Sequence, residues 1–320
     1  MPEGPEALLD AKDINSEVAG EVLFSVDFII EKGKKYDTLP GKDKFIRKLP
    51  LNIKSVTARG KKVIWHLYDD DGRKFWIIFA LGMTGIFKKK AGDHSDFRLN
   101  IFKKGMLKID DVSSPFGPEL KFSPIYVADK TIYFDDEMKW GNIYFCFTKD
   151  EKQKVFKDTG FDLMKYALIR NDDRQVARQY WKSINEKRRG NMKISKYVLE
   201  QKFFSGVGNY IKSEGLNRAK VHPGRLLSTI TKEESNLILF SFLDILKESY
   251  EQGGAHLRDF YRYNGEETKF KCVIYQAEDI PAKDRGKKEG ITDKYDSQNN
   301  RIKWIKYEDK RICYYTDIQV

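Results

Sequence analysis

Cysteine and histidine are scarce in this chain of 320 residues. The three cysteines are Cys146, Cys272 and Cys313, and no two of them form a C-x-x-C pair. A four-cysteine zinc site needs such pairs, so the spacing excludes one. A disulfide scaffold is also unexpected in a chain of this size. The four histidines are spaced too widely to indicate a metal site. We therefore expect no metal and no other cofactor.

Long hydrophobic runs are absent as well. No apolar stretch approaches the roughly 18 residues that a membrane span needs. The first residues, MPEGPEALLDAKD, are acidic and lack the basic start and apolar core of a signal peptide. We therefore expect a soluble, intracellular protein without a membrane partner. It would work in the cytoplasm (nucleoid) of a prokaryote or in the nucleus of a eukaryote.

The charge of the chain is unbalanced toward the basic side. The sequence has 59 Lys and Arg against 48 Asp and Glu, which leaves a net charge of +11. Basic residues recur in clusters at 88–90, 187–189 and 285–288, and aromatic residues make up 13% of the chain. This combination favours a polyanionic partner, most economically nucleic acid. A basic surface that is merely solvated would explain the composition equally well.

The first half of the chain changes from a helical to a strand-like pattern. Apolar residues at helical spacing predict a helix over 3–19, which stops at Gly20. Short β-type runs separated by turn residues follow up to about residue 148, and the sequence DDDG at 69–72 predicts a hairpin. These features predict an N-terminal domain over 1–148, an antiparallel β-sandwich flanked by the helix.

The second half predicts helices and then strands. Runs at helical spacing over 149–262 indicate a helical domain, whose last helix opens with a capping box at Thr231 and ends at Gly253. The tail, 263–320, contains a polar and charged stretch over 276–300, in which AKDRGKKEG at 282–290 predicts a loop. Two alternating strands follow and predict a hairpin. The expected fold class is therefore α+β.

The start of the chain could carry nucleophilic chemistry. Removal of the initiator Met would leave Pro2 with a free secondary amine, whose pKa near ~8 keeps a useful fraction neutral. Such an amine attacks an aldehydic or acetal carbon and gives an iminium ion. Glu3 and Glu6, one helical turn apart, could supply an acid and a hydrogen-bonding carboxylate. Pro and Glu are also simply favoured in a first helical turn, and taken alone this second explanation is the stronger one.

A glycine-rich loop precedes one of the predicted helices. In the sequence SGVGNY at 205–210, the glycines would let the backbone approach a phosphate. Gly208 and Asn209 would then lie at a helix N-terminus, where N–H groups and the helix dipole favour an anion. An ordinary glycine turn remains the alternative, because a single G-x-G is weak evidence.

Several short motifs follow one another in a characteristic order. They are PEGPE at 2–6, ARGK at 58–61, LGMTG at 81–85, DEMKWG at 136–141, the segment 201–214 and the segment 253–260. With these motifs the sequence resembles the formamidopyrimidine-DNA glycosylase / endonuclease VIII family, in its endonuclease VIII-like form. The resemblance implies that 201–214 is a helix-two-turn-helix motif.

The tail departs from the pattern of that family. The family's usual ending is a four-cysteine zinc finger, and here Tyr315 and Ile318 stand where the last two cysteines would be. Gln319 still matches the glutamine that follows them. The resemblance therefore implies a zincless finger. Its phosphate-binding residue would be Lys310 by register or Arg311 by chemistry, because Arg offers a bidentate fork.

The resemblance also implies a role for two loops. Met83, Met138 and Trp140 would fill the gap that an extruded nucleotide leaves, although Met83 could equally be a core methionine. Met138 and Lys139 replace two arginines of the family, so the preference for the base opposite the lesion would differ. Lys139 would contact DNA.

The resemblance finally implies an activity that suits the terminal amine. Pro2 would attack C1′ of a damaged nucleotide, Glu3 would act as acid or base, and Glu6 would support them. Lys61, which alone would be read as a solvated lysine, would contact the phosphate beside the lesion. The protein would be a bifunctional DNA glycosylase/AP lyase of base-excision repair, cleaving the strand by β,δ-elimination.

The expected partner is damaged double-stranded DNA, and the expected state is a monomer. The start of the chain favours oxidised pyrimidines as the excised bases. A non-catalytic DNA-binding or damage-sensing module on the same fold is the main alternative. An RNA-binding protein would account for Asn209 but not for the residues of the terminus.

Overall fold

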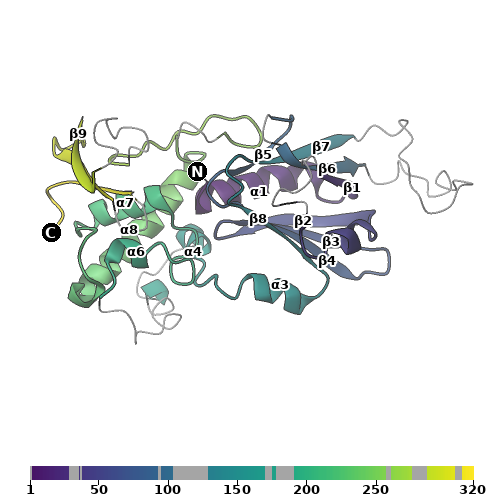
Figure 1. Ribbon diagram of the computed structural model, residues 1–320, viewed down its shortest axis with the longest axis horizontal. Coiled ribbons are helices and arrows are strands. Elements are labelled where there is room, and N and C mark those ends of the chain that lie inside the picture. The colour runs from purple at the N-terminus through teal and green to yellow at the C-terminus, as the bar shows by residue number, and fades with distance from the viewer. Residues whose placement is uncertain are drawn as a thin grey trace, which may run out of the picture.

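The computed structural model describes most of the chain. The described residues are 2–28, 36, 38–92, 95–103, 129–169, 175–177, 191–256, 261–275, 287–306 and 312–320. They form an N-terminal part built on strands, a helical part and a small C-terminal sheet (Figure 1). Among these residues, no helix is both long and apolar enough to cross a lipid bilayer.

The predicted N-terminal helix is present as α1 (Gly4–Val18). Its apolar residues recur at the spacing that puts them on one face, and this face packs into the core of the N-terminal part. Leu8 lies on another side of the helix and packs against the core of the helical part. Helix α1 therefore belongs to both cores, and its first turn lies between them (Figure 1).

The strands of the N-terminal part form one hydrogen-bonded antiparallel sheet in the order β5-β7-β6-β1-β2-β3-β4-β8. Where β1 meets β2, the described pairing covers two positions, whereas β1 pairs with β6 along its whole length. The sheet folds over at this weak seam into two layers, which confirms the predicted sandwich (Figure 1). The bounds are β1 (Val22–Phe28), β2 (Leu51–Arg59), β3 (Lys62–Tyr68), β4 (Lys74–Ala80), β5 (Gly85–Lys88), β6 (Ser95–Phe102), β7 (Lys130–Asp136) and β8 (Asn142–Cys146).

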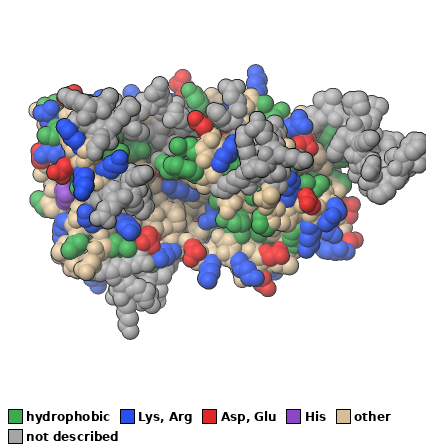
Figure 2. Space-filling model, viewed as in Figure 1, with side chains coloured by type: hydrophobic (Ala, Val, Ile, Leu, Met, Phe, Trp, Pro, Cys, Tyr) green, Lys and Arg blue, Asp and Glu red, His purple; other side chains and the backbone are tan. Residues whose placement is uncertain are grey.

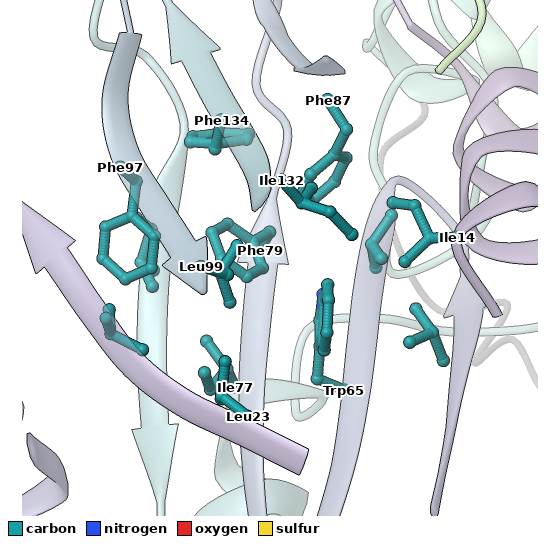
Figure 3. Packing of buried hydrophobic residues seen from close by; sticks show 14 of the residues in the cluster. Ile14, Leu23, Trp65, Ile77, Phe79, Phe87, Phe97, Leu99, Ile132 and Phe134 are labelled. Atoms are coloured by element: carbon teal, nitrogen blue, oxygen red, sulfur yellow. The ribbon is translucent and has the colours of Figure 1, made fainter. Parts of the chain in front are cut away.

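Aromatic and aliphatic side chains together fill the space between the layers (Figure 3). The ring of Phe79 lies at the centre, with ring centroids 5.1 Å from Phe87, 5.5 Å from Phe97 and 5.0 Å from Phe134. Edge-to-face and tilted contacts of this kind stabilise a core beyond the area they bury. The hairpin predicted at DDDG joins β3 to β4, with Gly72 in the left-handed region at φ +76°.

The helical part packs around a separate core. Its longest helix, α8, starts at the predicted capping box, where the Thr231 hydroxyl accepts the N–H of Glu234 at 3.1 Å. Of residues 170–190 in the predicted helical domain, only 175–177 belong to the described residues. The described helices are α2 (Lys42–Ile46) in the first part, then α3 (Lys149–Val155), α4 (Leu163–Ile169), α6 (Ile194–Tyr197), α7 (Asn209–Arg218), the 3-10 turn η2 (Leu227–Thr229) and α8 (Lys232–Glu251).

The C-terminal hairpin is part of a larger sheet than the sequence predicts. Strands β10 (Arg301–Lys306) and β11 (Ile312–Tyr315) pair as expected, and β9 (Glu289–Tyr295) adds a third antiparallel strand at the edge. The loop predicted over 282–290 is therefore wrong at its end, because β9 begins at Glu289. Of the seven residues of β9, only Thr292 is buried, so the strand shows no apolar alternation.

The two larger parts are joined by hydrogen bonds from the β2–β3 hairpin. The guanidinium of Arg59 donates to the carbonyl oxygens of Thr159 at 3.1 Å and Gly160 at 3.2 Å. The ammonium of Lys62 donates to the Thr159 hydroxyl at 2.7 Å. The hairpin that carries Lys61 at its tip is thereby fixed to the segment that leads into the helical part.

Replacing Arg59 tests this connection. We expect Arg59→Met to lower the free energy of unfolding by about 1–3 kcal/mol, because two carbonyls lose charged donors. Arg73→Met is the matched control: Arg73 is exposed in the β3–β4 hairpin, and its loss should cost less than about 0.5 kcal/mol. Urea unfolding of both variants gives the comparison, and equal losses would mean that the Arg59 contacts add nothing.

Candidate active site and nucleic-acid interface

The first turn of α1 is set into the N-terminus of α7. Pro2 and Glu3 are buried, although they come at the start of the chain. The carboxylate of Glu3 accepts the backbone N–H of Gly208 at 2.6 Å, of Tyr210 at 3.0 Å and of Ile211 at 3.4 Å. These donors belong to the first turn of a helix, where unpaired N–H groups and the helix dipole favour a negative charge.

This contact changes the interpretation of the glycine-rich loop. The N-terminus of α7 does bind an anion, as its sequence suggests, but the anion is the protein's own Glu3. The N–H of Gly208 is therefore occupied by Glu3 in this structure. What the loop contributes is close approach: a Cβ on Gly208 would lie 2.2 Å from Glu3 Oε1 and 2.3 Å from Lys61 Nζ. Only glycine leaves room for both groups.

The buried Glu3 and the partly buried Lys61 bring opposite charges close together beside Gly208. Burial raises the pKa of the Glu3 carboxyl to about 6, against the opposing effects of the Lys61 charge and of the backbone N–H donors, while the nearby Glu6 raises it further. A carboxyl group with a pKa near neutrality can exchange a proton at physiological pH. Lys61 comes from the tip of the β2–β3 hairpin, so the site combines residues from both parts of the molecule.

Glu6 holds this arrangement together from one turn further along α1. Its carboxylate accepts the N–H of Glu3 at 2.8 Å, the N–H of Ala255 at 2.9 Å and the hydroxyl of Tyr210 at 3.1 Å. Burial and the nearby Glu6 raise the pKa of Tyr210 well above its ordinary value, so the phenol keeps the proton that it donates. Glu6 thus joins α1, α7 and the end of α8. The sequence offers no signal for Tyr210.

Asn209 is the first residue of α7 and is half-buried. Its Oδ1 accepts the ammonium of Lys212 at 3.2 Å, and the same ammonium donates to the carbonyl of Ile312 at 2.8 Å. A lysine ammonium can only donate hydrogen bonds, so the oxygen of the Asn209 amide is the atom that faces Lys212. The NH₂ of the same amide therefore points away from Lys212. The fully buried Lys212 was not expected from the sequence. Lys310 and Arg311 lie outside the described residues.

The two loops expected to enter DNA lie together at the edge of the sandwich. Met138 is 50% exposed and Trp140 is 54% exposed, whereas Met83 is half-buried. Lys139 lies between the exposed pair, and its ammonium forms an ion pair with the carboxylate of Asp96. A DNA phosphate would have to compete with that carboxylate for Lys139.

On one face of the molecule, charged side chains are spread rather than gathered. On the face shown in Figure 2, Lys and Arg side chains occur over both larger parts, with acidic side chains among them. Within the described ranges, no three His, Cys, Asp or Glu side chains come together to hold a metal ion. The contacts among buried charged groups define the candidate site instead, and it consists of the Pro2–Glu6 turn, Lys61 and the start of α7.

The raised pKa of Glu3 predicts a pH-dependent contribution to stability. A folded-state pKa near 6, above the ordinary 4.5, stabilises the fold below about pH 4.5, and this contribution is lost as pH rises through about 6. The stability of the wild type relative to Glu3→Gln should therefore fall by about 2 kcal/mol between about pH 4 and pH 7. Urea unfolding across this range measures the difference.

Glu233→Gln serves as the control, since Glu233 is exposed in the first turn of α8. Its stability should run parallel to that of the wild type over the same range. If the free energy of unfolding of Glu3→Gln also changed with pH in parallel with that of the wild type, the pKa of Glu3 would not be raised.

Comparison with known families gives two matches. Residues 1–114 match the formamidopyrimidine-DNA glycosylase N-terminal domain, and residues 170–260 match the formamidopyrimidine-DNA glycosylase H2TH domain. The second match includes α7 and α8, and the first includes α1 and the β2–β3 hairpin. Together they span well over half of the 320 residues.

Curated relatives carry the same family name. A formamidopyrimidine-DNA glycosylase of Salmonella arizonae is 26% identical over 265 residues, which covers 83% of this chain and 84% of that protein. One of Zymomonas mobilis is 39% identical over 89 residues, which covers 27% of this chain and 33% of that protein.

Solved structures show the same fold at low sequence identity. The MutM (Fpg) protein of Thermus thermophilus superimposes with a TM-score of 0.69 at 19% identity, covering 98% of this chain and 97% of that one. The Lactococcus lactis enzyme, non-covalently bound to DNA that contains an AP site, gives a TM-score of 0.65 at 19% identity, covering 99% of both chains. With both domain models matched in order, the chain belongs to the formamidopyrimidine-DNA glycosylase family, the bifunctional DNA glycosylase/AP lyases of base-excision repair.

Proposed function

We propose that this protein excises oxidised bases, with pyrimidines favoured, from double-stranded DNA and then cleaves the strand, using the amine of Pro2. The observation that carries the proposal is the burial of the Pro2–Glu6 turn against α7, with Glu3 and Lys61 meeting at Gly208. If Glu3 served only to cap its own helix, its carboxylate would not need to accept three N–H groups at the start of α7. The endonuclease VIII-like sequence of this turn supports the preference for pyrimidines.

The chemistry starts with the nitrogen lone pair of Pro2 once Met1 has been removed. The lone pair forms a bond to C1′ while the bond from C1′ to the base breaks, and the departing base takes a proton. Opening of the sugar ring gives an iminium ion on Pro2. Glu3, with a pKa of about 6, exchanges the protons that these steps require, and Lys61 binds the phosphate beside the lesion.

Strand cleavage follows from the same intermediate. The iminium acidifies C2′, so loss of a proton there expels the phosphate at C3′, and a second elimination expels the one at C5′. Hydrolysis of the iminium returns the Pro2 amine. Glu6 keeps Glu3 in place through the hydrogen bond to its backbone N–H.

Binding to DNA would use groups on both sides of this turn. Asn209 would contact a phosphate through its NH₂, and Gly208 would allow the close approach. The ion pair with Asp96 makes a phosphate contact of Lys139 conditional on its release. Lys310 and Arg311 remain the proposed phosphate ligands of the finger. Met83, Met138 and Trp140 would fill the duplex after the damaged base has left it. A monomer would suffice.

The three proposed units are 1–148, 149–262 and a zincless finger over 263–320. Side-chain packing supports a finger without metal: Ile302, Trp304 and Tyr314 are almost fully buried in the small sheet and pack with Ile274. A Cβ on Gly290 would lie 2.8 Å from the Trp304 ring, so the indole packs directly against the backbone of β9.

Borohydride trapping tests the nucleophile. Reduction should join wild-type protein covalently to DNA that contains an oxidised pyrimidine, because the iminium is reduced to a stable amine. Pro2→Gly, or an N-terminal tag left in place, should abolish the trapped product. Lys61→Met should still trap, which separates the terminal amine from the nearby lysine.

A tag at the C-terminus is the matched control for the blocked terminus, and it should leave trapping intact. Undiminished trapping with a blocked N-terminus would contradict the role of Pro2. Binding of lesion DNA without any trapping would instead favour a damage-sensing module.

Removal of metal tests the finger. Chelators should change neither the melting temperature nor the excision rate, and purified protein should contain no stoichiometric zinc, because apolar packing holds the sheet. Trp304→Ala should mimic the loss of a finger metal and cost about 3–5 kcal/mol. One zinc per chain, or loss of activity with a chelator, would contradict the prediction.

A further inference from the structure

One buried carboxylate joins the two loops that carry Met83, Met138 and Trp140. Asp136 is fully buried. Its Oδ1 accepts the hydroxyl of Thr84 at 2.5 Å, and its Oδ2 accepts the N–H of Gly141 at 2.7 Å and the hydroxyl of Tyr36 at 2.5 Å. Thr84 belongs to the loop 81–85, and Gly141 ends the loop 136–141. A single side chain thus holds both loops.

The backbones of the two loops are also in direct contact. A Cβ on Gly82 would lie 2.6 Å from the nitrogen of Gly141 and 2.6 Å from the carbonyl carbon of Trp140. A Cβ on Gly141 would lie 2.8 Å from the Ala80 oxygen and from the Asp136 carboxylate. Gly82 has φ +61°, a conformation that favours glycine. The two loops therefore pack backbone against backbone.

The loop 136–141 is further fixed around its exposed residues. The N–H of Met138 donates to the Thr84 hydroxyl at 3.2 Å, and that hydroxyl donates to Asp136. Lys139 has φ +55°, an uncommon conformation for a residue with a side chain, and its ammonium is bound by Asp96. Strain of this kind persists only where the surroundings hold it. Yet Met138 and Trp140 stay half exposed to solvent.

Large apolar side chains that stand out from a fixed backbone suit insertion between bases. Proteins that separate stacked base pairs commonly use such apolar wedges. A wedge that is already rigid loses less conformational entropy when it inserts. Extrusion of a base is costly from a duplex and least costly from a strand that is already single.

We propose that Asp136 is a positioning residue that assembles loops 81–85 and 136–141 into one rigid wedge before DNA binds. Excision from a duplex then depends on Asp136, whereas excision of the same lesion from a single strand does not. The proposal rests on the proposed function, because it concerns how that activity reaches a paired base. It assigns Asp136 no contact with the substrate.

The test compares Asp136→Asn with wild type on one oligonucleotide containing an oxidised pyrimidine. Single-turnover excision is measured with the strand paired and with the strand alone. In Asp136→Asn one of the two acceptor oxygens becomes an NH₂, which opposes either the donor Thr84 or the donors Tyr36 and Gly141 and so loosens the wedge. We expect the ratio of duplex to single-strand rates to fall about ten-fold, with the single-strand rate within about two-fold of wild type.

Asp135→Asn is the matched control. Asp135 is the neighbouring buried carboxylate, and it binds Lys88 and Ser95 rather than either wedge loop. Its rate ratio should equal that of wild type. Thr84→Val tests the same wedge without touching a charge, and it should lower the ratio in the same direction even where Asp136→Asn folds poorly.

The outcomes separate the two proposals. An unchanged ratio in both wedge variants, or an equal fall of both rates, would overturn the positioning role while leaving the activity in place. A wild type that excises neither substrate would overturn the proposed function and this inference with it.

Discussion

The structure depends on a buried carboxylate at the N-terminus of a helix. Glu3, the N-cap residue of α1, is buried, and its carboxylate accepts the N–H groups that begin α7. Removing a carboxylate from water is costly unless donors replace the water, and here the helix dipole adds to the donors. The same contact joins the strand-based part to the helical part and buries the terminal turn.

Close approach of backbones makes this contact possible. The N–H of Gly4 donates to the carbonyl of Gly206 at 2.9 Å, and the α-carbons of Gly4 and Gly60 both lie beside Gly206. Gly206 has φ +96°, which an L side chain rarely adopts. The start of α1, the tip of the β2–β3 hairpin and the loop before α7 therefore meet without side chains between them. This close packing of backbones brings the side chains of Lys61 and Glu3 together beside Gly208.

Buried carboxylates recur wherever distant segments must be joined. Glu214 in α7 accepts the N–H groups of Val273, Ile274 and Tyr275 at 2.7–2.9 Å, and so fixes this segment of the C-terminal unit to α7. Asp136 does the same for the two wedge loops. Each carboxylate offers several acceptor sites in one small group, which suits the capture of a loop whose own N–H groups have no strand or helix partner. Losing one of them would leave buried donors unpaired.

The sequence by itself determined the local elements and their order. Apolar spacing marked α1, the capping box at Thr231 marked the start of α8, and DDDG marked a hairpin, because these signals act between residues close in the chain. It also marked Pro2, Glu3, Glu6 and Lys61 through their motifs.

Only the tertiary structure decided which groups meet. Glu3 and Gly208 are 205 positions apart, and no local preference encodes that pairing. Packing between distant segments likewise decides that Lys212 is buried, that Tyr210 donates to Glu6 and that Asp136 binds both wedge loops. Strand β9 escaped prediction because an exposed edge strand needs backbone partners rather than an apolar pattern.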